Sequence, residues 1–483
     1  MFSINISNII LVVAIYIISI IAYLIIKKKF INIKKKTFII YSSIFLVGVI
    51  VFFGTGVFGR FVDINSINTK QYSTKDLTED LKQLEKSIMK ENPLYFADKK
   101  NLQVLFKGAY EKIDDGMTEL EFYRLINPIV VDIHCGHTNL SISQALQMNR
   151  KENAKFFPLD VTLINNQLYI LENDETSGVS AGDEILSINK KSSDEIINIL
   201  IKNTSGDGKN RAKPRYIISK FFNNKFYDFV DESNSFKVQL IKKDGTTYSA
   251  NLNASYREKY NTSAWELHST EFKGEDYYNS VIYDDYALLN IRVFFKEKGN
   301  DFNSFLDDFF SKLQKQNIDK LVIDLRGNYG GNPDMAKALL SHLITKKMDY
   351  FNSDLPFLYD LMGYQKPILP AATNFQGETA ILTDGACFST TGQFCSLFKY
   401  HDLGTVVGME TGGTYVCTDG SEDIILNNTR LRLHYSTLAY KVAVNDMSDI
   451  EGVKPDVAIS PSVDMLLNHK DLTMEKAINI LGK

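Results

Sequence analysis

The chain has few cysteines and no strong excess of charge of either sign. Its four cysteines, in 483 residues, stand at positions 135, 387, 395 and 417, and none has the CxxC or CxxH spacing of a metal site. The formal net charge is −4, and no strongly basic block occurs beyond the first 36 residues. There is also no internal repeat and no low-complexity tract. These absences argue against a disulfide-stabilised framework, a zinc-binding module and a nucleic-acid-binding protein.

Charged residues are also missing from two long stretches near the N-terminus, residues 9–26 and 37–59. Each is near the roughly 20 residues that a membrane-spanning helix requires. The loop between them, residues 27–36, holds six lysines, which favours a cytoplasmic position for it. We therefore expect residues 1–61 to form a two-helix anchor in the cell membrane, with the rest of the chain outside the cytoplasm. A cleaved signal peptide is the alternative, but the first residues carry no positive charge and no small-x-small cleavage site follows.

The first half of the body shows a change of hydrophobic period. Residues 74–150 begin with helical patterns and end in a loop and a strand, which predicts a small helical segment. From Phe156 the period becomes two, and residues 155–255 predict a small β module built around one helix. Within that module the stretch 202–225 is an insertion to which the sequence pattern assigns no place.

The second half alternates strands and helices. This pattern covers residues 275–465 and predicts an α/β core with a largely parallel sheet, followed by a C-terminal helix at 466–483. The predicted fold class is therefore α/β (α+β) and multidomain. Ligand sites in such sheets form at the carboxyl ends of the strands.

Two segments of the predicted core carry the most chemical information. Residues 321–331 read as a buried strand that runs into a glycine loop, Arg-Gly-Asn-Tyr-Gly-Gly. Residues 388–413 begin with Phe-Ser-Thr-Thr-Gly, continue as a helix and end in a second glycine-rich loop. Both Ser389 and the first loop follow strand ends, so we expect them to meet. An exposed hydroxyl facing backbone N–H groups is what acyl transfer by serine requires. The alternative is that Ser389 only caps the helix.

These motifs, in this order, resemble the tail-specific, or C-terminal processing, serine peptidases, including their tricorn-core branch. The resemblance covers residues 75–465 and includes Gly-Val-Lys-Pro-Asp at 452–456. It implies peptide-bond hydrolysis and a core of the ClpP/crotonase-like type. It also implies that residues 155–255 are a PDZ-like domain, which would capture a substrate by strand addition, often at a free C-terminus.

The resemblance assigns Ser389 as the nucleophile and His137, in a Cys-Gly-His-Thr segment, as the general base. An imidazole with a pKa near ~6.5 can take the serine proton and return it to the leaving amine. His134 is the alternative base. In the tricorn-like branch an acidic residue before Gly-Val-x-Pro-Asp orients the histidine, and both Asp449 and Glu451 occupy that region.

Backbone groups complete the predicted site. Gly330 and Gly331 are the candidates for one oxyanion donor, and the N–H of Thr390 is the candidate for the other. Two positions depart from the family pattern: Thr414 stands where the processing branch has its catalytic lysine, and Gly392 stands where many members have glutamate. A Ser-Lys mechanism is therefore not expected.

Taken together, the sequence predicts a membrane-anchored serine endopeptidase that acts on extracytoplasmic proteins or peptides. No metal cluster, cofactor site or nucleotide-binding loop is expected, and the oligomeric state is left open. The alternative is a protein that keeps the peptidase fold but only binds peptides or hydrophobic ligands.

Overall fold

The computed structural model describes residues 66–256, 277–296, 301–353 and 365–482. The described residues all belong to one compact unit. Among the described residues no helix is long and apolar enough to cross a bilayer. The two expected membrane helices, at 9–26 and 37–59, lie outside the described residues.

The first part of the body is helical, as the sequence pattern predicts. Ser73 caps its first long helix by accepting a hydrogen bond from the backbone N–H of Asp76, and Leu77, Leu81 and Leu84 are fully buried on one face. Thr118 and Glu121 form a reciprocal capping box at a later helix. The elements are η1 (Ile67–Thr69), β1 (Gln71–Tyr72), α3 (Thr74–Glu91), α4 (Lys99–Tyr110), β2 (Met117–Thr118), α5 (Glu119–Val131), β3 (Asn139–Ser141) and α6 (Gln144–Asn153).

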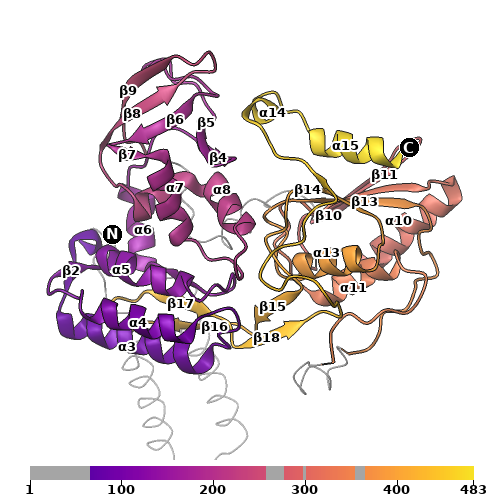
Figure 1. Ribbon diagram of the computed structural model, residues 1–483, viewed down its shortest axis with the longest axis horizontal. Helices are drawn as coiled ribbons and strands as arrows, with labels where there is room; N and C mark the ends of the chain where they lie inside the picture. Colours follow the sequence, from indigo (N-terminus) through magenta and orange to yellow (C-terminus); the bar gives the residue numbers. More distant parts are fainter. Residues whose placement is uncertain (1–65, 257–276, 297–300, 354–364, 483) are drawn as a thin grey trace, which may run out of the picture. The chain divides into compact units, whose positions relative to one another are not determined.

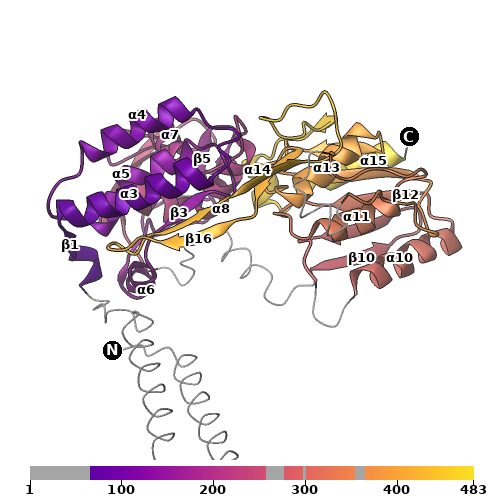
Figure 2. The same cartoon turned by 90° about the horizontal axis from the view of Figure 1, so that it is seen from below.

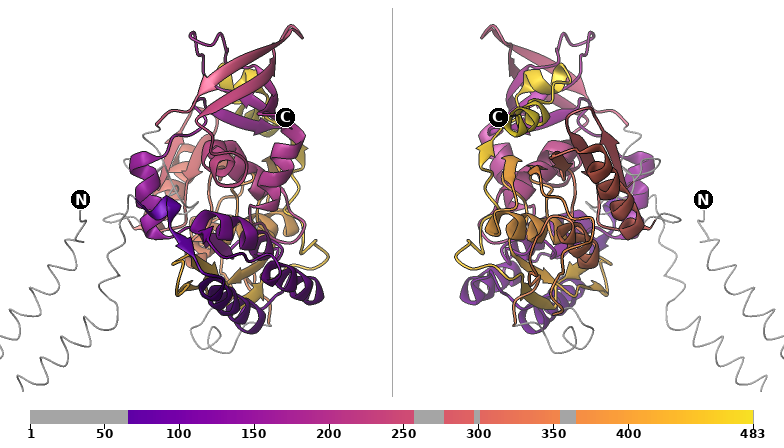
Figure 3. Two further views of the ribbon diagram at one scale, coloured as in Figure 1. Left: turned by 90° about the vertical axis from the view of Figure 1, so that its left-hand side faces the viewer. Right: turned by 90° about the vertical axis from the view of Figure 1, so that its right-hand side faces the viewer.

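An antiparallel sheet with its own hydrophobic core follows, with strand order β4-β5-β6-β8-β9 and β7 paired to β6. Alternate residues of β8, Phe236, Val238 and Leu240, enter that core, which explains the period of two. β8 and β9 form a long hairpin (Figure 3). The elements are β4 (Val161–Ile164), β5 (Gln167–Ile170), β6 (Glu184–Ile188), β7 (Lys191–Ser192), α7 (Ser193–Lys202), α8 (Ala212–Phe229), β8 (Ser235–Ile241) and β9 (Thr247–Asn253). The unassigned insertion thus contains most of α8, which packs against β4 and α7.

The remaining core is a six-stranded sheet of order β10-β11-β12-β13-β14-β19 (Figure 1). Only the β10–β11 pair is antiparallel, so the expectation of a largely parallel sheet is confirmed. Leu321 and Ile323 face a core shared with α10, α11 and α13, whereas Val322 faces α15. The elements are β10 (Tyr278–Ile282), β11 (Ala287–Ile291), α10 (Phe302–Gln316), β12 (Lys320–Asp324), α11 (Pro333–Ser341), β13 (Glu378–Thr383), α13 (Thr390–Tyr400), β14 (Thr405–Gly408), β19 (Val457–Ala458), α14 (Val463–Leu467) and α15 (Leu472–Leu481).

Two small sheets connect distant parts of the chain. β15 (Val416–Asp419) pairs with β18 (Leu438–Lys441), and β16 (Glu422–Ile425) pairs with β17 (Arg432–Tyr435). β17 also pairs with β3, so that Leu433 lies opposite Leu140 (Figure 2). This pairing anchors the loop that precedes β3, which carries His137, against the C-terminal half of the chain.

Candidate active site

Ser389 lies at the sharp turn between β13 and α13, at the carboxyl edge of the parallel sheet. Its backbone has φ +55° and ψ −127°, a conformation that non-glycine residues rarely adopt and that costs of order 1–3 kcal/mol. The residue stands at the N-cap position of α13, yet its side chain makes no capping hydrogen bond. The hydroxyl is therefore directed to other partners, as in the strained strand-to-helix turns that expose nucleophilic serines.

His137 is the partner of that hydroxyl. Its Nε2 lies 3.0 Å from the Oγ of Ser389, and its ring centroid lies 4.5 Å from that of Phe388. Burial of the ring lowers the pKa of His137 to about 4, although the neighbouring carboxylate of Asp419 acts in the opposite direction. The imidazole is therefore neutral at pH 7 and can accept a proton. His134, the alternative base, has its Nε2 3.7 Å from Asp132 instead.

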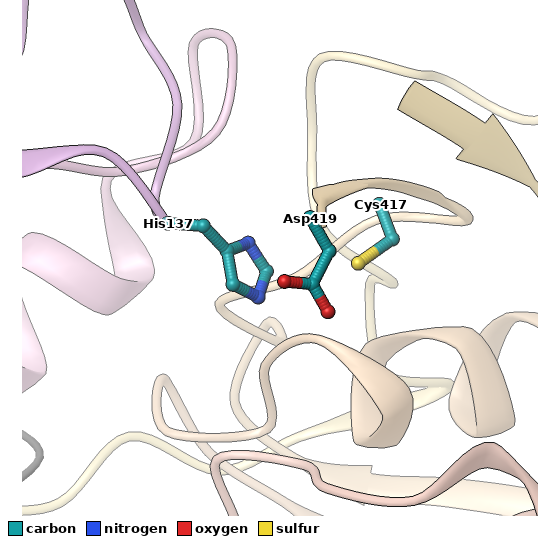
Figure 4. Close-up of side chains that lie close together, drawn as sticks. All are labelled: His137, Cys417 and Asp419. Carbon is teal, nitrogen blue, oxygen red and sulfur yellow. The ribbon is translucent and has the colours of Figure 1, made fainter. Parts of the chain in front are cut away.

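The carboxylate beside His137 belongs to Asp419, which the sequence analysis did not identify. A ring nitrogen of His137, a carboxylate oxygen of Asp419 and the Sγ of Cys417 all lie within 4.8 Å of one another. Figure 4 shows the Asp419 carboxylate directed at the imidazole from β15. The Nδ1 of His137 is buried and has no hydrogen-bond partner within the described part of the chain. Asp419 is thus the acid that lies beside the imidazole of His137.

The two acids expected from the sequence lie elsewhere. Asp449 accepts a hydrogen bond from the hydroxyl of Tyr95 at 2.9 Å, and Glu451 pairs with Lys454 at 2.9 Å. Neither forms a hydrogen bond with His137 in the described structure. Asp419 could not be found by its spacing from Gly452, because it belongs to a strand about 30 residues before the two expected acids. No pattern in the sequence marks Asp419 as different from the other acidic residues of that region.

The three expected oxyanion donors lie around Ser389, but they are not equivalent. A Cβ on Gly330 would lie 2.8 Å from the Cβ of Ser389 and 2.9 Å from the nitrogen of Thr390, so only glycine fits there. However, the N–H of Gly330 already donates to the side chain of Asn328 at 2.9 Å. The N–H groups of Gly331 and Thr390 have no recorded acceptor among the described residues. The hydroxyl of Thr390 donates to the carbonyl of Gly331 at 2.7 Å and joins the two segments.

Two buried charged residues of the insertion hold the segment that carries His137. The N–H of Gly136 donates to Asp207 at 2.6 Å, and the ammonium group of Lys213 donates to the carbonyl of Gly136, also at 2.6 Å. The Lys213 nitrogen also lies 3.9 Å from the ring centroid of Phe388. Burial raises the pKa of Asp207 to about 6 and lowers that of Lys213 to about 8, and each charge opposes the shift of the other. No role could be predicted for this insertion, because its contacts to Gly136 depend on the tertiary fold.

The two departures from the family pattern have structural consequences. The hydroxyl of Thr414 is buried and closes a turn with Val416, accepting from its N–H at 2.9 Å. A Cβ on Gly392 would lie 2.8 Å from the Cα of Gly413, so no side chain fits at that position. The catalytic lysine and the glutamate of the family pattern therefore have no equivalent at positions 414 and 392.

A neutral imidazole within hydrogen-bond reach of a strained serine is the arrangement that serine hydrolases use. Residues 285–459 match the model of peptidase family S41. The resemblance to tail-specific serine peptidases is thereby confirmed, and the match supports a hydrolase.

Solved structures show a similar fold. The structure of mature CPAF complexed with lactacystin superposes with a TM-score of 0.61 at 13% identity, covering 84% of this chain and 98% of that one. A second structure of mature CPAF gives a TM-score of 0.60 at 13% identity, over 84% of this chain and 96% of that one. No curated protein matches the sequence.

Proposed function

We propose that the protein is a membrane-anchored serine endopeptidase that cleaves extracytoplasmic proteins or peptides. The observation that carries this proposal is the 3.0 Å separation between the Nε2 of His137 and the Oγ of Ser389. The non-catalytic alternative, a binding protein with a peptidase fold, gives no reason for such a contact. The anchor and the extracytoplasmic location rest on the charge pattern of residues 1–61.

In the proposed reaction, Ser389 attacks the carbonyl carbon of the scissile peptide bond while His137 removes the hydroxyl proton. The same proton then passes from His137 to the amine of the leaving peptide, and water repeats the two steps to release the acyl group. The N–H groups of Gly331 and Thr390 would stabilise the oxyanion, and a missing donor of this kind typically costs roughly 3–4 kcal/mol. Asp419 would stabilise the imidazolium as it forms, in the role first expected for Asp449 or Glu451.

Residues 155–255 would act as a PDZ-like substrate-binding domain. The antiparallel sheet β4-β5-β6-β8-β9 supports this proposal, because an extended peptide can add to the edge of such a sheet. The domain is also connected to the site. Asp207 lies between α7 and α8, Lys213 lies on α8, and both form hydrogen bonds with Gly136.

The test is hydrolysis of an unfolded protein by the full-length chain in detergent, followed by mass spectrometry of the products. Wild type is expected to release internal fragments, and Ser389→Ala is expected to release none. Peptides with a free or an amidated C-terminus, added as competitors, would show whether the terminus is recognised. Equal cleavage by wild type and Ser389→Ala would overturn the assignment of the nucleophile, and intact substrate with folded wild type would overturn the peptidase proposal.

A further inference from the structure

Three side chains next to Ser389 combine nitrogen, sulfur and oxygen donors. His137 precedes β3, and Cys417 and Asp419 stand two residues apart on β15, so their side chains leave the strand on the same face. The donor atoms of all three lie within 4.8 Å of one another. Figure 4 shows the thiol and the carboxylate turned toward the imidazole.

This donor set is that of a zinc site. Zn²⁺ binds imidazole nitrogen, thiolate sulfur and carboxylate oxygen, and bond lengths of about 2.0–2.3 Å in a tetrahedron place the donors about 3.3–3.8 Å apart. Donor atoms at the largest separation of 4.8 Å therefore need to approach one another by about 1–1.5 Å to surround the ion. The fourth position would be taken by water or, with Nε2 as the ligand nitrogen, by the hydroxyl of Ser389, whose Oγ lies 3.8 Å from the Cys417 sulfur and 3.0 Å from Nε2.

A second observation concerns the same imidazole ring. The Nδ1 of His137 is a buried polar atom without a hydrogen-bond partner in the described structure. Leaving such an atom unpaired costs about 1–3 kcal/mol. A metal ion at Nδ1 would satisfy it.

We propose that His137, Cys417 and Asp419 form a binding site for Zn²⁺ that switches the peptidase off. Coordination through Nε2 occupies the lone pair that would accept the serine proton, and coordination through Nδ1 leaves the proton of the neutral ring on Nε2, the atom that faces Ser389. With either nitrogen bound to the metal, Nε2 cannot accept the serine proton. The inhibitory part of this proposal rests on the proposed function, whereas the binding part does not.

Zinc binding by this site includes the loss of one proton. Cys417 is buried, which raises the pKa of its thiol well above the ordinary value, so the metal-free residue carries its proton. The ligand is the thiolate, and each bound ion therefore displaces one proton to solvent. No redox step or further reactant is involved.

Binding is tested with Co²⁺, which occupies zinc sites and is visible in absorption spectra. Reduced, chelator-treated full-length protein is titrated with Co²⁺. A near-ultraviolet thiolate-to-cobalt charge-transfer band is expected in wild type, with one ion bound per chain. The band is expected to disappear in Cys417→Ser and to persist in Cys395→Ser, the matched control for a buried cysteine on α13. The absence of the band in folded wild type, or its persistence in Cys417→Ser, would overturn the proposal.

Inhibition is tested separately by labelling with a fluorophosphonate probe in the presence of Zn²⁺. Zinc is expected to reduce labelling of wild type at least 10-fold, a chelator is expected to restore it, and Cys417→Ser is expected to label equally with and without zinc. Undiminished labelling of zinc-loaded wild type would overturn the inhibitory role. If metal-free wild type does not label at all, the proposed function fails, and the cobalt spectrum still decides whether the metal site exists.

Discussion

The Nε2 of His137 and the Oγ of Ser389 lie 3.0 Å apart although 252 positions separate them in the chain. The contact depends on three separate constraints. β3 pairs with β17 and holds the loop of His137 against the C-terminal half. Asp207 and Lys213 fix the Gly136 peptide on both sides. The backbone of Ser389, with φ +55°, turns the hydroxyl out of the helix cap and toward the ring.

Asp419→Asn is expected to lower kcat by about 10²–10⁴-fold, because the imidazolium formed during the reaction loses its neighbouring negative charge. The carboxylate of Asp419 also raises the pKa of His137 against the larger effect of burial. Its removal should therefore move the acid limb of the kcat/KM profile to lower pH. Asp449→Asn and Glu451→Gln are the controls, and both should remain within a few-fold of wild type. A large loss of activity in either control, with Asp419→Asn unchanged, would mean that the acid expected from the sequence acts on His137 and that Asp419 does not.

Lys213→Met is expected to move the acid limb of the kcat/KM profile to higher pH. In wild type, burial lowers the pKa of His137 to about 4, and the positive charge of Lys213 contributes to that shift. The rate should therefore rise with pH through about 4 and be level at neutral pH, since only the neutral imidazole accepts a proton. Without the charge of Lys213 the pKa of His137 rises, and the limb should appear at higher pH. The variant also leaves the carbonyl of Gly136 without its buried donor, which should cost about 1–3 kcal/mol of folding free energy. An unshifted pH profile in a folded variant would mean that Lys213 acts on stability alone.

Gly330→Ala is expected to reduce activity by at least about 10²-fold, the loss typical of a displaced oxyanion donor. The new methyl group would lie 2.8 Å from both the Cβ of Ser389 and the carbonyl oxygen of Phe388, so the serine must move. Gly108→Ala, in the last turn of α4, is the control because nothing lies within 4 Å of the added atom. That control should keep full activity and unfold at an equal or slightly higher temperature. Equal activity of the two variants would show that the glycine loop does not border the reacting centre.

Asp80→Ala is expected to destabilise the protein by about 3 kcal/mol or more, because several buried donors lose their acceptor together. The fully buried carboxylate of Asp80 accepts hydrogen bonds from the N–H groups of Asn428 and Thr429 at 2.9 and 2.7 Å, and from the Thr429 hydroxyl at 2.6 Å. These residues form the turn between β16 and β17, the strand that pairs with β3. Glu79→Ala, an exposed neighbour on α3, should change little. Urea unfolding of both variants measures the difference, and equal midpoints would contradict the account.

The periodicity of the sequence predicted most of the elements but not the contacts between them. Leu77, Leu81 and Leu84 recur at helical spacing, and Phe236, Val238 and Leu240 alternate as in a strand, so local patterns sufficed. Ser389 could be found because glycine loops stand on both sides of it. Asp419 could not, because its position depends on where β15 pairs with β18. The insertion with Asp207 and Lys213 was missed for the same reason, since its role depends on contacts to Gly136 in another part of the chain.

The central claim is that His137 activates Ser389 for attack. It is tested most directly by labelling the full-length, metal-free protein with a fluorophosphonate probe beside Ser389→Ala and His137→Ala, and by locating the adduct with mass spectrometry. The account predicts an adduct on Ser389 in wild type, none in Ser389→Ala, and labelling slowed by about 10²-fold or more in His137→Ala. A folded wild-type protein that does not label, or a His137→Ala variant that labels at the wild-type rate, would contradict it.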